Sequence, residues 1–75
     1  MKNMTLRKTV NLLLRISKTH PYLGELSKEQ QYQSAIATAQ LFKEFAEEGH
    51  TDEAMDLPVE HWNQVIEQLN TKRGV

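Results

Sequence analysis

The sequence contains no cysteine, and among its 75 residues there are only three glycines and two prolines. Without thiols, the chain can hold neither a disulfide nor a zinc ion bound by thiolates. The lack of cysteine also fits a reducing compartment, so we expect a cytoplasmic location. The three glycines stand far apart, which excludes a glycine-rich loop of the kind that cradles phosphate groups.

Long apolar runs are absent as well. The longest is the leucine triplet at residues 12–14, far short of the roughly 18 apolar residues that cross a bilayer. Charges interrupt this leucine-rich opening at Arg15 and Lys18, and no small-residue cleavage site follows, so we do not expect a signal peptide. The basic stretch also lacks an aromatic anchor for a membrane surface, so we expect no membrane association.

The short length limits what the chain can do by itself. We expect residues 1–75 to form a single helical domain. A core of this size leaves a net stability of about 3–5 kcal/mol, and small chains without cross-links often depend on a partner or on a second copy. The net charge is −1, so a general attraction to nucleic acid is not expected.

Apolar side chains recur at helical spacing in the opening stretch and predict a first amphipathic helix over residues 5–18. Its apolar arc is wide, because Leu12 and Ile16 extend the stripe. Pro21 disfavours helical geometry at the preceding residue and ends the helix. We expect a loop at residues 20–26, with its apolar side chains folded back onto the helices.

Ser27 and Gln30 match a capping box, which predicts that a second helix begins there and runs over residues 28–48. Alanines on its apolar stripe permit a neighbouring helix to approach closely. Gly49 follows the last predicted turn and is a natural left-handed terminator.

A third helix is predicted over residues 58–71, with Asp56 as its cap and Pro58 in its first turn. Trp62 belongs to its apolar stripe and is expected in the core. Residues 51–55 can add one short helical turn. Because no stretch alternates as a half-buried strand would, the sequence predicts an all-α fold, a small three-helix bundle.

No group of residues has the spacing of an active site. The histidines His20, His50 and His61 are not paired at the spacing of metal ligands, and the serines lack the context of a nucleophile. An enzyme is the least favoured hypothesis, since it would need a desolvated pocket around the acids of the 52–60 stretch. Those acids instead favour helix starts. We expect no enzymatic activity, no cofactor and no metal; the acids are Asp52, Glu53, Asp56 and Glu60.

Charge is unevenly distributed along the chain. Every charged residue before Glu25 is positive, and all ten acids follow. The helical spacing gathers the early cations opposite the apolar arc. They can form a solvated face that pairs with the acidic remainder, although each exposed pair contributes only about 0–1 kcal/mol. They can also bind an acidic protein or a phosphate backbone. These cations are Arg7, Lys8, Arg15 and Lys18.

The leading hypothesis is a small, non-enzymatic interaction or regulatory protein, an adaptor or inhibitor that binds another macromolecule through these four cations. The wide apolar arc offers Leu12, Leu14 and Ile16 for self-association as a homodimer. The alternative is a transcriptional regulator that binds nucleic acid with the same basic face. A recognition helix at residues 58–70 would, however, display acids that phosphate repels.

Overall fold

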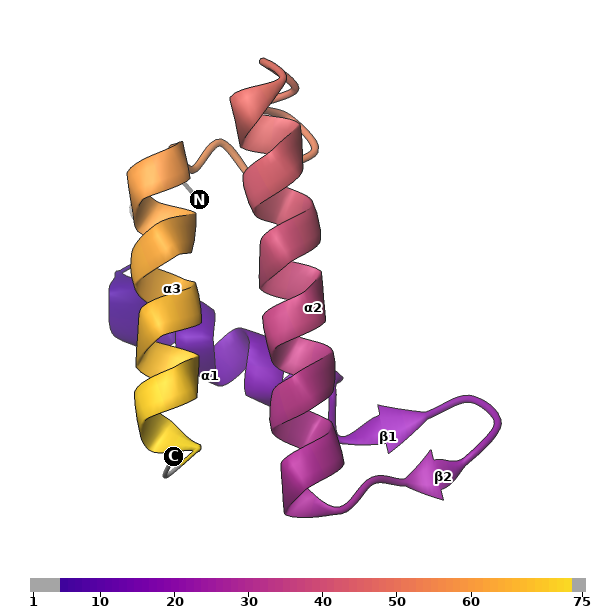
Figure 1. Ribbon diagram of the computed structural model, residues 1–75. Coiled ribbons are helices and arrows are strands. Elements are labelled where there is room, and N and C mark those ends of the chain that lie inside the picture. Colours follow the sequence, from indigo (N-terminus) through magenta and orange to yellow (C-terminus); the bar gives the residue numbers. More distant parts are fainter. Residues whose placement is uncertain (1–4, 74–75) are drawn as a thin grey trace.

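Three helices and a short hairpin form the computed structural model, which describes residues 5–73 (Figure 1). Helices α2 and α3 run side by side in opposite directions, and α1 lies across both of them. Between α1 and α2 the chain makes a two-stranded antiparallel sheet. The elements are α1 (Leu6–Ile16), β1 (Thr19–His20), β2 (Gly24–Glu25), α2 (Lys28–Glu47) and α3 (Val59–Lys72).

The three predicted helices are present, and their ends lie within two residues of the predicted ones. Thr5 caps α1, because its side chain accepts a hydrogen bond from the Lys8 backbone N–H at 3.1 Å. The predicted capping box of α2 is confirmed. The Gln30 side chain accepts from the Ser27 backbone N–H at 3.0 Å, and the Ser27 hydroxyl accepts from the Gln30 N–H at 3.2 Å.

The predicted terminator of α2 is also confirmed. Gly49 has a φ of +85°, the left-handed conformation that glycine adopts without strain. Its N–H donates to the Ala46 carbonyl at 3.2 Å, and the His50 N–H donates to the Phe45 carbonyl at 2.8 Å. This pair of bonds is the Schellman motif, which satisfies carbonyls that the helix end leaves open.

The connections between the helices differ from the predictions in three places. The all-α description is incomplete, because two-residue strands are too short to show the alternation that identifies a strand. Asp56 does not cap α3, because it has a φ of +58° and Leu57 separates it from the cap residue, Pro58. A cap needs extended backbone directly before the first turn. Residues 51–56 form hydrogen-bonded turns rather than a helix, and the Asp56 N–H donates to the Thr51 carbonyl at 2.7 Å.

The core draws on all three helices and on the turn before α3. The predicted place of Trp62 in the core is confirmed, because the side chain is fully buried. Ala35 and Ala39 are also fully buried, so α3 and α1 can pack close to α2 as the alanine stripe predicts. The buried apolar residues are Val10, Leu13, Ala35, Ala39, Ala54, Leu57, Trp62, Val65 and Leu69.

The Trp62 indole joins separate parts of this core. Its Nε1–H donates to the Ala54 carbonyl at 3.2 Å, which anchors the turn to α3. Its ring lies 5.0 Å from the Phe42 ring of α2, measured between centroids, and the His61 ring packs edge-on at 5.9 Å. A large aromatic side chain with its polar atom satisfied stabilises a small core more than any smaller residue can.

We expect Trp62→Ala to lower the free energy of unfolding by about 3–5 kcal/mol, because it removes this ring and leaves a cavity. That loss is comparable to the whole stability of a chain of this size, so much of the variant should be unfolded. Trp62→Phe keeps a ring beside Phe42 and should lose less. Urea unfolding followed by circular dichroism measures both; a Trp62→Ala chain with the wild-type midpoint would contradict the structure.

Candidate functional site

The cations of α1 lie on exposed surface. Arg7, Lys8 and Arg15 are exposed, and Lys18 is exposed just after the helix ends. The buried side of α1 carries Thr9, Val10 and Leu13. The amphipathic arrangement that the sequence predicts is therefore present, while the role of the cations stays a prediction.

No carboxylate between residues 5 and 73 lies within ion-pair distance of these four cations. The ion pairs of this part of the chain lie elsewhere. Arg73 pairs with Glu29, and its hydrogen bonds to the carboxylate lower the pKa of Glu29. The His50 ring lies 4.0 Å from the Glu48 carboxylate and 3.8 Å from that of Glu53. Among the described residues, none of these pairs joins a cation of the basic face to an acid.

The apolar arc of α1 divides between core and surface. Leu14 packs against the core and is half-buried, and its carbonyl accepts a 2.6 Å hydrogen bond from the Gln31 side-chain amide of α2. Leu12 is also half-buried. Ile16 is 57 % exposed at the end of the helix. Of the three residues predicted for self-association, Ile16 alone offers most of its surface to another molecule.

The hairpin places apolar side chains in solvent. The expectation that residues of this loop fold back onto the helices is wrong, because Tyr22 is 91 % exposed and Leu23 is 67 % exposed. The strands pair only with each other, and the hairpin stands out from the helices beside the start of α2 (Figure 1). Gly24, with a φ of +74°, turns the chain back at the tip.

His20 holds this tip in one conformation. Its Nδ1 accepts hydrogen bonds from the backbone N–H groups of Tyr22 at 3.0 Å and of Leu23 at 3.2 Å. At the base of the hairpin, the Leu26 N–H donates to the Lys18 carbonyl at 3.0 Å. The exposed side chains therefore sit on an ordered turn, which sequence reasoning missed because nothing local marks His20 as a turn acceptor.

A threonine–histidine pair joins α1 to α3. The Thr9 hydroxyl lies 2.8 Å from Nε2 of His61 and 3.0 Å from the Thr5 carbonyl. Such a pair resembles a nucleophile beside a base, but Thr9 is fully buried and cannot reach a substrate. His61 is half-buried, and the pair serves to fix one helix against the other.

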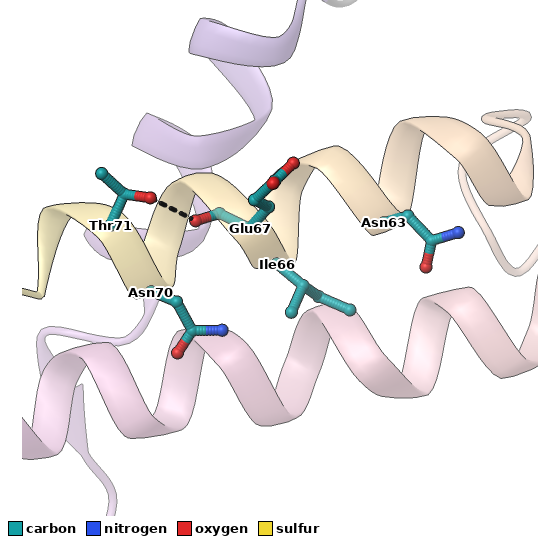
Figure 2. A pocket seen from close by; sticks show the side chains of 5 residues that line it. All are labelled: Asn63, Ile66, Glu67, Asn70 and Thr71. Atoms are coloured by element: carbon teal, nitrogen blue, oxygen red, sulfur yellow. Dashed lines mark hydrogen bonds between the residues drawn. The ribbon is translucent and has the colours of Figure 1, made fainter. Parts of the chain in front are cut away.

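Two depressions on the described part of the surface are shallow and open. One of about 640 Å³ lies along α3, and Figure 2 shows Ile66 and Asn70 directed toward α2 while Glu67 turns away. All its lining residues come from one helix, so it has no opposing wall. Another, of about 250 Å³, is lined by α2 residues alone. Neither depression includes the acids of the 52–60 stretch. The α3 depression is lined by Asn63, Ile66, Glu67, Asn70 and Thr71.

Between residues 5 and 73, no three histidine or acidic side chains are grouped so that they could hold a metal ion. None of the helices described has the length of apolar sequence that crossing a bilayer needs. No model of a known protein family, no curated protein and no solved structure matches this chain. The distinctive surface features of residues 5–73 are the exposed cations Arg7, Lys8, Arg15 and Lys18 and the apolar hairpin tip.

Acidification should destabilise the fold through His61. Burial lowers the pKa of this histidine, because desolvation disfavours the charged ring. The unfolded chain then binds a proton at a higher pH than the folded chain does. We therefore expect the free energy of unfolding to fall as the pH drops below about 6.5, the ordinary pKa of histidine, and to level off below the folded-state pKa.

Urea titrations at several pH values, on the wild type and on His61→Gln, measure this effect. The difference between the two isolates His61, because both chains share His20 and His50. The wild type should lose more stability on acidification than the variant does. Parallel pH profiles for the two chains would show that His61 is not held in its neutral form.

His20→Ala should loosen the hairpin without unfolding the protein. No residue of the hairpin belongs to the core, so the free energy of unfolding should change by less than about 0.5 kcal/mol. The amides of Tyr22 and Leu23 lose their acceptor and should exchange with solvent faster, as NMR measures. His20→Asn is the matched control, since its side-chain oxygen can accept the same local bonds. Unchanged amide exchange in His20→Ala would refute the role of the ring.

Proposed function

We propose that this chain is a small, non-enzymatic interaction protein of the cytoplasm, an adaptor or inhibitor that binds an acidic surface of another protein with the cations of α1. The observation that supports this proposal is that Arg7, Lys8, Arg15 and Lys18 are all exposed and that no carboxylate between residues 5 and 73 lies within ion-pair distance of them. Exposed cations that form no ion pair with the described acids of their own chain are available to an acidic partner.

The cations would set the orientation and the rate of binding. Exposed charges at the rim of an interface contribute little affinity each, but they steer association and exclude partners of the same sign. Affinity then needs apolar contacts beside them. Ile16, which is 57 % exposed, ends the same helix and lies next to Arg15 in the sequence. An exposed apolar side chain thus follows the last cation of α1 and can supply such a contact to a folded protein.

Nucleic acid is the alternative ligand for the same cations, and the negative charge on the surface of α3 disfavours it. Glu60 and Glu67 are exposed there, and His61 is held by Thr9. A helix that presents two carboxylates and no free cation near its start is repelled by a phosphate backbone. An acidic protein is therefore the better fit to this face.

The test is quantitative capture of partners from the native host with the tagged full chain. Lys8→Gln/Arg15→Gln removes two cations of α1, and Lys43→Gln/Lys72→Gln removes the same charge from α2 and α3. We expect a protein that the wild type and the control retain, and that the α1 variant retains about tenfold less, equivalent to about 1.4 kcal/mol. Retention should persist after nuclease treatment.

Two results would overturn the proposal. Equal capture by both double variants would show that the α1 cations do not select the partner. Capture that nuclease abolishes, together with binding to a short duplex that weakens steeply between two salt concentrations, would assign the cations to nucleic acid instead. Circular dichroism of each variant confirms that the helices are intact.

A further inference from the structure

We infer that the chain forms a symmetric homodimer in which the α2 helices of two copies lie antiparallel, and each hairpin packs against the acidic end of the other copy's α2. This inference goes beyond the proposed function and does not depend on it, because its contacts come from the hairpin and α2. Of the four cations of the proposed function, Lys18 lies at the base of the hairpin and is shared by both surfaces.

The apolar side chains left in solvent point to this interface. The large hydrophobic residues that are exposed between residues 5 and 73 include Tyr22 and Leu23 at the hairpin tip and Leu41, 48 % exposed, in the second half of α2. Exposed apolar groups held on an ordered element mark interaction sites. The hydrogen bonds of His20 fix the tip before any partner arrives, which lowers the entropy cost of binding.

The outer face of α2 suits contact with a copy of itself. Some of its exposed residues recur at spacings of three and four and form a stripe along the helix, while Lys28, Glu29 and Glu47 are exposed beside it. Ala37 lies at the middle of this 20-residue helix, and its small side chain lets a second helix approach closely. A two-fold axis at Ala37 sets Gln33 opposite Leu41 of the second copy and Gln30 opposite Glu44. The stripe consists of Gln30, Gln33, Ala37, Gln40, Leu41, Glu44 and Glu48.

The shape of the chain permits both contacts at once. The hairpin stands out from the start of α2 and forms a corner with that helix (Figure 1). α2 is about 30 Å long at 1.5 Å per residue, so an antiparallel copy brings its hairpin to the far end of the first helix. Each hairpin then lies against the far end of α2 of the other copy. The same contact is made twice, as an isologous interface requires.

Charge selects the antiparallel arrangement. The hairpin end is positive, and the far end of α2 is negative, so antiparallel copies bring opposite signs together and parallel copies bring like signs together. The antiparallel order also opposes the two helix dipoles favourably. Because both halves of the interface occur in one chain, the fitting occupant is a second copy. The hairpin end carries Lys18, Glu25 and Lys28 beside the ion pair of Glu29 with Arg73, and the far end carries Lys43, Glu44, Glu47 and Glu48.

Light scattering on the full chain, from about 5 to about 200 μM, tests the assembly by mass action. We expect a mass approaching twice the monomer mass of 8.7 kDa. Ala37→Glu places two like charges at the axis and should leave a monomer, and Tyr22→Ser/Leu23→Ser should raise the dissociation constant at least about tenfold. Gln68→Glu, on the exposed face of α3, is the control and should dimerise like the wild type.

Engineered cysteines test the geometry, since the natural chain has none. Ala37→Cys should form a disulfide with its own copy under mild oxidation, because the two side chains meet at the axis. Leu23→Cys and Glu48→Cys should cross-link when mixed, more than either does alone. Gln68→Cys should not cross-link.

A monomer at every concentration overturns the inference. So does a dimer in which neither Ala37→Cys nor the mixed pair cross-links, or one that Tyr22→Ser/Leu23→Ser leaves unchanged. These failures are distinct from failure of the proposed function. A monomeric chain that still captures its partner through Lys8 and Arg15 would lose the dimer and keep the adaptor.

Discussion

The contact between the Trp62 indole and the Ala54 carbonyl fixes the rest of the molecule in place. It holds a turn in which Met55 and Asp56 both have left-handed backbone, a conformation that such residues adopt only when their surroundings enforce it. With the turn fixed, α3 returns along α2 and the indole packs on Phe42. The position of α3 in turn sets the neighbouring residue, His61, against Thr9 of α1. Removal of the indole would therefore loosen the turn, α3 and α1 together.

The features that the sequence predicted well are local ones. The capping box at Ser27 and the terminator at Gly49 depend on residues within three or four positions, so the pattern contains all the necessary information. The pairing of Thr9 with His61 joins residues 52 positions apart, and no local sequence pattern near either residue predicts it. The hairpin was missed for another reason. Hydrophobicity alone places Tyr22 and Leu23 inside, whereas the self-contained pairing of the two strands keeps them outside.

For the candidate surface, too, local features could be predicted from the sequence, whereas contacts between distant elements could not. The segregation of charge along the chain was visible in the sequence, and so was the amphipathic character of α1. Whether the cations meet the acids depends on distances between elements, which only the folded chain supplies. The same holds for the apolar arc of α1. The spacing of its residues predicts how wide the arc is, but it does not predict which of its side chains contact the core. Leu14 turns out to contact the core, and Ile16 does not.

The hairpin interrupts the chain between two helices and gives no residue to the core. Changes of side chain at its tip therefore have little effect on whether the protein folds. Selection can alter what the tip recognises while the helices stay as they are, in the way that loops on a rigid scaffold diversify. A set of sequences built on these three helices could thus differ in specificity at positions 21–23 alone, and the same property makes the tip a convenient place to graft a new binding motif.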